Sequence, residues 1–226
     1  MDDLFDGVRA VLFDMDGTLV ETNIDFSLMR REMFAIGARY GVDADDLVGL
    51  DILAIVDFIE ARLKDQARKD DAASARREAF AKLEEIELLH SDDASPIEGA
   101  HEVLRALHDA DIRTAIVTRN CRAAVELCLG MTGISADALL TRDDVVRAKP
   151  HPEHLLAALE MLQVPATEAV TVGDHWMDVQ GGKAAGTRTV GFLRADRPEN
   201  FFERERPDLV IHSLAELLDP IARLKK

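Results

Sequence analysis

Cysteine and aromatic residues are scarce in this chain of 226 residues, and its 27 Lys and Arg residues are outnumbered by 43 Asp and Glu residues. Its two cysteines, Cys121 and Cys128, fall in one expected helix, about two turns or ~10 Å of rise apart. That separation is too long for a disulfide without distortion of the helix. We therefore expect both thiols to be reduced, as in an intracellular protein.

The charge balance and the lack of long apolar runs exclude several kinds of partner. A formal net charge of −16 argues against binding to nucleic acid or to an anionic membrane, and an aromatic content of 5% leaves little for stacking on bases. No run approaches the ~18 apolar residues of a membrane span. The first residues carry no basic secretion signal, so a cytoplasmic location is expected.

The most informative segment of the chain is 14–18, with the sequence DMDGT, which ends the mainly apolar run 8–13. In an extended segment, residues two apart point to the same side, so Asp14 and Asp16 present two neighbouring carboxylates. Clustered anions are costly unless a cation, a proton or an exposed cleft relieves them. Asp and Gly are also common in ordinary turns, so this segment alone does not establish a catalytic site.

Six β-rich runs are predicted to be strands, at 9–13, 114–117, 138–140, 169–172, 189–193 and 209–211. Helical patterns separate the later runs from one another. Between the first and second runs, by contrast, residues 26–90 show only helical periodicity, with three apolar stripes that are typical of a small helical bundle. This order predicts a parallel sheet with helices on both faces and right-handed crossovers.

The simplest architecture for this order is an α/β fold with an insertion after its first strand. We expect a Rossmann-like, doubly wound core of residues 1–19 and 93–226, with an all-helical domain of residues 20–92 inserted in it.

Four polar segments occur in order along the chain, and three of them directly follow predicted strands. They carry the pair Asp14 and Asp16, then Thr118 with Arg119 and Asn120, then Lys149, and finally the pair Asp174 and Asp178. Because ligands bind at the carboxyl ends of the strands in an open parallel sheet, these segments should meet at one site.

Those residue types suit phosphoryl transfer. Three or four carboxylates with one lysine form a hard oxygen site, which favours Mg²⁺ over zinc. A divalent ion lets the anions coexist and offsets the repulsion between a carboxylate nucleophile and a phosphate dianion. A carboxylate can form an aspartyl phosphate, while a hydroxyl and an ammonium can bind the phosphoryl oxygens.

The four segments resemble the signature motifs of the haloacid dehalogenase (HAD) superfamily, in its phosphatase branch with an α-helical cap, the group that includes phosphoglycolate phosphatase and β-phosphoglucomutase. The resemblance covers essentially the whole chain and is more specific in the core than in the inserted helices. It implies that residues 20–92 form a cap domain over an HAD-like core.

The resemblance also implies a role for each motif residue. Asp14 would be the nucleophile, and Asp16 the general acid and then the general base. Thr118 and Lys149 would bind phosphate, and Lys149 would also orient Asp14. The resemblance implies that the metal is held by Asp14, the backbone carbonyl of Asp16, Asp174 and, directly or through water, Asp178.

Within this resemblance, Asp16 decides the reaction type, because the branches that cleave carbon–halogen or carbon–phosphorus bonds lack the second aspartate. The resemblance thus implies a Mg²⁺-dependent phosphoric monoester hydrolase, a monomer or homodimer, acting on a small phosphorylated metabolite. A phosphosugar mutase of the same fold is the main alternative. A non-enzymatic phosphoaspartate switch is a further one, which the chain length and the inserted helices oppose.

Several polar residues near the motifs keep two interpretations open. Arg119 and Asn120 are candidates for substrate binding, although Arg119 could equally face solvent. His151 and His154 have a spacing that could hold a metal, but roles in a loop and a helix start fit them better. His175 could line the mouth of the site or take part in packing.

Overall fold

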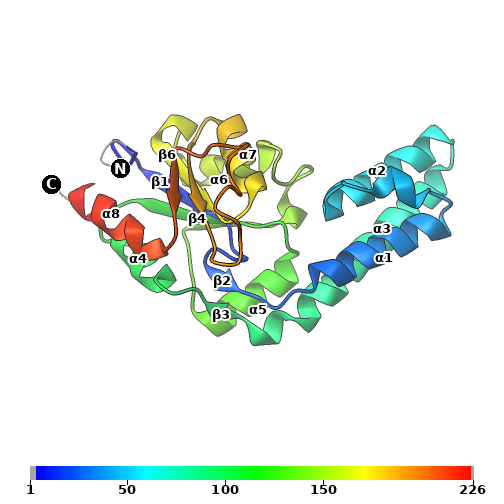
Figure 1. Ribbon diagram of the computed structural model, residues 1–226, viewed down its shortest axis with the longest axis horizontal. Helices are drawn as coiled ribbons and strands as arrows, with labels where there is room; N and C mark the ends of the chain where they lie inside the picture. The colour runs from blue at the N-terminus through cyan, green and yellow to red at the C-terminus, as the bar shows by residue number, and fades with distance from the viewer. Residues whose placement is uncertain (1–3, 225–226) are drawn as a thin grey trace. The chain divides into compact units, whose positions relative to one another are not determined.

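The computed structural model describes residues 4–224, apart from the side chains of Asp92 and Leu224, and the chain divides into two compact units. The first unit holds the residues up to Thr22 and those from Asp93 onward, and the second is Asn23–Asp92. All four polar segments that follow or lie near strand ends belong to the first unit (Figure 1).

The first unit is built on six parallel strands in the order β5-β4-β1-β6-β7-β8. Their bounds are β1 Ala10–Phe13, β4 Arg113–Val117, β5 Ala138–Leu140, β6 Ala169–Gly173, β7 Arg188–Phe192 and β8 Leu209–Ile211. Central strand β1 is buried along its whole length, as is typical of a strand covered on both faces. The expected α/β fold is confirmed, and each predicted strand lies within one residue of the observed one.

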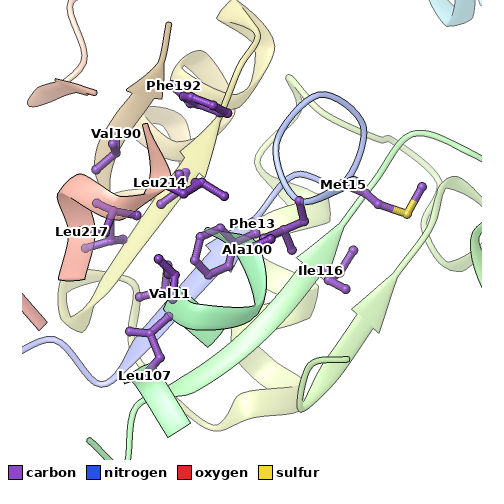
Figure 2. Packing of buried hydrophobic residues seen from close by; sticks show 14 of the residues in the cluster. Val11, Phe13, Met15, Ala100, Leu107, Ile116, Val190, Phe192, Leu214 and Leu217 are labelled. Carbon is purple, nitrogen blue, oxygen red and sulfur yellow. The ribbon is translucent and has the colours of Figure 1, made fainter. Parts of the chain in front are cut away.

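Successive side chains of β1 point to opposite faces of the sheet and so enter two separate apolar clusters. Val11 and Phe13 face α4 (Ala100–His108), and Figure 2 shows Leu107 of that helix close to Val11. The same cluster includes residues of α5 (Arg122–Thr132) and α8 (Leu218–Leu224). Together these helices cover one face.

The opposite face of the sheet carries α6 (Glu153–Leu162) and α7 (Trp176–Ala185). Gly182 lets α7 approach the sheet closely, because a Cβ there would lie 2.7 Å from the Thr189 side chain. Short 3₁₀ turns complete the chain: η2 Ser91–Asp93, η3 Arg142–Asp144, η4 Ala166–Glu168 and η5 Leu214–Leu217.

A two-stranded antiparallel ribbon, β2 (Val20–Glu21) with β3 (Ser95–Pro96), was not anticipated. Val20 pairs with Pro96, and the Ile97 amide donates to the Leu19 carbonyl at 2.9 Å. Because of this ribbon, residues 20–22 are part of the first unit, three residues beyond the expected boundary. Strands of two residues are too short to show a period in sequence.

The second unit packs three helices around its own apolar core. They are α1 (Phe26–Arg39), α2 (Ile52–Asp65) and α3 (Lys69–Leu89), with the turn η1 (Ala44–Leu47) between the first two. The buried residues follow the expected helical stripes: Met29, Met33 and Ile36; Ile55, Val56, Ile59 and Leu63; Ala72, Ala75, Ala79, Leu83 and Ile86. Within the described residues, none of the helices is long and apolar enough to cross a membrane.

Candidate active site

The site begins where β1 ends and the chain turns sharply. The Asp14 amide still donates to Val172 of β6 at 2.9 Å, and Gly17 then adopts a φ of +76°, which favours glycine. A Cβ on Gly17 would lie 2.3 Å from the Asp174 carboxylate. Thr18 fixes the same approach, since its hydroxyl accepts a hydrogen bond from the Asp174 amide at 3.1 Å. The first and last polar segments are therefore in direct contact.

Lys149 lies between two of the carboxylates. Its Nζ is 2.7 Å from Asp14 Oδ1 and 2.6 Å from Asp178 Oδ1, although more than a hundred residues separate it from the first of these. The lysine side chain is 3% exposed, so its charge is almost fully removed from water. Asp178 is also held by the His175 amide, which donates to its other oxygen at 3.1 Å.

Burial and neighbouring charges set the protonation of this cluster. Burial lowers the pKa of Lys149, but Asp14 and Asp178 outweigh it and leave that pKa above its ordinary value. Burial, reinforced by Asp178, raises the pKa of Asp14 to about 6, although Lys149 acts in the opposite direction. At neutral pH the lysine is therefore charged, and Asp14 is mostly ionised.

A third carboxylate, Asp174, completes the cluster. One ligand oxygen from each of Asp14, Asp174 and Asp178 lies within 4.8 Å of the others. Burial, together with the charges of Asp14 and Asp178, raises the pKa of Asp174 to about 8. Three converging carboxylates of this kind fit a divalent cation, because oxygen ligands suit hard ions and a cation would relieve their repulsion.

Asp16 does not belong to this group of three carboxylates and is held by different partners. The Thr22 hydroxyl donates to its Oδ1 at 2.6 Å, and Asn120 Nδ2 donates to its Oδ2 at 2.5 Å. The side chain of Asp16 is thus outside the three-carboxylate group, so only its backbone carbonyl is left as the expected ligand. That ligand role stays a prediction.

The three residues after β4 contact one another and other parts of the site at the carboxyl ends of the strands. Thr118 is buried, and its hydroxyl accepts from the Asn120 amide at 3.3 Å. Asn120 contacts Asp16, and its expected role in substrate binding stays a prediction. Arg119 is partly buried and reaches the sulfur of Met177 in the first turn of α7.

Sequence reasoning missed two residues that hold the first turn. Arg194, just after β7, donates to the Gly17 carbonyl at 3.1 Å and to Glu21 at 2.6 Å. Thr22, the Asp16 partner, lies at the end of the ribbon strand β2. The position of Arg194 at the carboxyl end of a strand could have identified it, whereas no local pattern marks Thr22.

The histidines near the motifs are in packing and loop positions. Among the described residues, the one group of three metal-ligand side chains contains no histidine, and both ring nitrogens of His154 are bonded to backbone atoms. His175 begins α7, where its Nδ1 accepts from the Met177 amide, and its ring packs near Trp176 and Phe201.

Comparison with known proteins supports the family resemblance that the motifs indicate. Residues 8–186 match the family model for haloacid dehalogenase-like hydrolases. Pyrophosphatase PpaX of Halalkalibacterium halodurans is 32% identical, over 94% of this chain and 96% of that relative.

Two solved structures share the fold across nearly the whole chain. One is an HAD family hydrolase from Deinococcus radiodurans with bound phosphate and sodium, which is 25% identical with a TM-score of 0.62 and covers 96% of each chain. The other, a predicted phosphoglycolate phosphatase from Haemophilus somnus, is 19% identical with a TM-score of 0.62, over 94% of this chain and 97% of that one.

The chain belongs to the haloacid dehalogenase-like hydrolase family. Within that family it falls in the phosphatase branch, as its motifs indicate.

Proposed function

We propose that this protein is a Mg²⁺-dependent phosphatase that works through an aspartyl phosphate on Asp14. The observation that carries the proposal is the convergence of Lys149 on Asp14 and Asp178, with Asp174 beside them, at the carboxyl ends of the strands. Mg²⁺, held by Asp14, Asp174, Asp178 and the Asp16 carbonyl, would screen the negative charge of the phosphate as the nucleophile approaches it.

The two aspartates of the first turn have environments that suit different roles. Asp14 Oδ2 would attack phosphorus while its Oδ1 is held by Lys149, and the bond to the leaving oxygen breaks. Asp16 would give its proton to that oxygen and then take one from the water that attacks phosphorus and frees Asp14. Thr22 and Asn120 support this role, because they hold the Asp16 carboxyl apart from the cluster.

Lys149 and Thr118 are proposed to bind the transferred phosphoryl group. Lys149 supplies the one buried ammonium of this edge among the described residues, and Thr118 adds a buried hydroxyl from the neighbouring strand. The helical unit Asn23–Asp92 is proposed to act as a cap that limits the access of water during the reaction. The cytoplasmic location stays a prediction, as does the choice between monomer and homodimer.

The substrate is proposed to be a small phosphorylated metabolite, with pyrophosphate as a second candidate because the relative PpaX is a pyrophosphatase. Arg119 adjoins Thr118 and is a cation in a chain of net charge −16, so it is proposed to attract an anionic group of the substrate. If so, Arg119→Gln should weaken binding of pyrophosphate and phosphoglycolate more than binding of an aryl phosphate whose leaving group carries no charge.

Phosphate release from a panel of phosphorylated metabolites, pyrophosphate and an aryl phosphate, with and without Mg²⁺, tests the proposal. Asp14→Asn should lower the rate with every substrate by roughly 1,000-fold or more, since the nucleophile is lost. Unchanged hydrolysis by this variant would overturn the assignment of the nucleophile.

Two outcomes would favour the alternatives. Conversion of glucose 1-phosphate to an isomer without phosphate release would indicate a phosphosugar mutase. A phosphorylated Asp14 that persisted for many minutes without turnover would indicate a phosphoaspartate switch.

A further inference from the structure

His154 is a fully buried polar side chain in the first turn of α6 that the proposed reaction does not use. Both of its ring nitrogens bond to backbone atoms outside the helix. Nδ1 accepts from the Lys149 amide at 3.3 Å, and Nε2 lies 3.1 Å from the Thr141 carbonyl. The helix N-cap is Pro152, so these bonds do not cap the helix.

The two partners fix the form of the imidazole. The Lys149 amide can only donate, so Nδ1 carries a lone pair, and the Thr141 carbonyl can only accept, so Nε2 carries the proton. Burial, together with the charge of Lys149, lowers the pKa of His154 to about 3, which keeps the ring neutral. A neutral ring with one donor and one acceptor satisfies both backbone groups at once.

Thr141 links this contact to the opposite side of the site. It directly follows β5, where the Thr118 amide donates to the Leu140 carbonyl at 2.9 Å. The next residue, Arg142, donates its amide to the Asn120 carbonyl at 3.2 Å. The imidazole therefore connects the backbone of Lys149 to the strand end that is bonded to the 118–120 loop.

We propose that His154 is a positioning residue for Lys149, which sets the backbone from which the ammonium reaches Asp14 and Asp178. This inference rests on the proposed function for its effect on rate, but not for its geometry. Lys149 Nζ must be 2.7 Å from one carboxylate and 2.6 Å from the other, a placement that tolerates little movement of its backbone.

Three substitutions of His154 distinguish the positioning of Lys149 from a role of His154 in core packing alone. His154→Asn keeps an acceptor near the position of Nδ1, His154→Gln keeps a donor near Nε2, and His154→Leu keeps neither. We expect kcat/KM to fall by roughly 10- to 100-fold in the Leu and Gln variants, with weaker inhibition by inorganic phosphate, and by less in the Asn variant. Equal rates in the Asn and Gln variants would overturn the proposal.

A matched control accounts for lost stability. Leu162, on the same helix, is buried in the apolar cluster on the face of the sheet that carries α6 and α7. Its side chain makes no hydrogen bond to the Lys149 loop. Leu162→Ala should lower Tm without changing the inhibition constant of inorganic phosphate. If Leu162→Ala shifts that constant as much as His154→Leu does, the effect of His154 is only structural.

Hydrogen exchange at the Lys149 amide tests the geometry without any substrate. The amide should be protected in the wild type and in His154→Asn, and should exchange at least 10-fold faster in His154→Gln, because its acceptor is gone. Unchanged protection in His154→Gln would overturn the positioning role. Failure of the proposed function would show instead as a wild-type protein that releases no phosphate while this protection pattern persists.

Discussion

Each unit contains a cation between two carboxylates, and the two arrangements differ in burial. In the helical unit, Arg76 is 2.7 Å from Asp57 and 2.8 Å from Glu60, with the arginine side chain 33% exposed. In the first unit, Lys149 makes equally short contacts but is 3% exposed. Water screens the first group far more than the second, and of the two groups only the second lies beside carboxyls whose pKa is raised toward neutral pH, to about 6 for Asp14 and about 8 for Asp174.

The comparison also indicates why the charges are there. Exposed ion pairs contribute little to stability, and the helical unit already has its own apolar core. Buried charges cost desolvation energy that a well-packed apolar group would avoid. Such a group at the carboxyl ends of parallel strands is therefore best explained by chemistry.

The largest expected difference follows from removing each cation. Lys149→Met should lower the free energy of unfolding by about 3 kcal/mol or more, because two buried carboxylates lose their partner, and should lower kcat by roughly 100- to 1,000-fold. Arg76→Met, the matched change in the helical unit, should cost about 1 kcal/mol or less and leave kcat unchanged. Urea denaturation with metal chelated measures the first quantity. Similar losses in the two variants would remove the distinction between the units.

Most of the fold could be predicted from the sequence because its signals are local. Short β-rich runs identified the six strands, and helical stripes identified the core of the second unit. The convergence of the motif segments was predictable because three of them directly follow strands, which a parallel sheet brings to one edge.

What the sequence did not reveal depends on contacts between distant residues. The β2–β3 ribbon joins residues on either side of the inserted helices, and Thr22, which directly follows β2, bonds to Asp16. The contact of Asn120 with Asp16 needs the β1 and β4 ends to be adjacent, which no local pattern shows. The two bonds of His154 likewise depend on the packing of α6.

A smaller effect should appear in the pH dependence of stability. Asp14 and Asp174 have folded-state pKa values of about 6 and about 8, above those of the unfolded chain. Their contribution to stability is present at low pH and is lost as pH rises through these values, because the folded cluster must then hold adjacent anions. Mg²⁺ should restore it, so the rise in Tm on adding Mg²⁺ should be larger at pH 8 than at pH 5.

Thermal melts with and without Mg²⁺ at the two pH values measure this effect. Asp174→Asn, which removes one anion, should reduce the difference between them, whereas Asp57→Asn in the helical unit should leave it unchanged. A Tm shift that is the same at both pH values would contradict a site made of these three carboxylates.

The smallest expected effect concerns the hydrogen bond from Thr22 to Asp16, which no pattern in the sequence predicts. Thr22→Val removes the hydroxyl that donates to Asp16 at 2.6 Å while keeping the size of the side chain. Asn120 still holds the other oxygen, so we expect kcat to fall only about 10-fold, with KM little changed. Thr22→Ser keeps the donor and should retain most of the activity. If the Val and Ser variants lose activity equally, the side chain matters for the packing of the ribbon, and Asp16 is oriented by Asn120 alone.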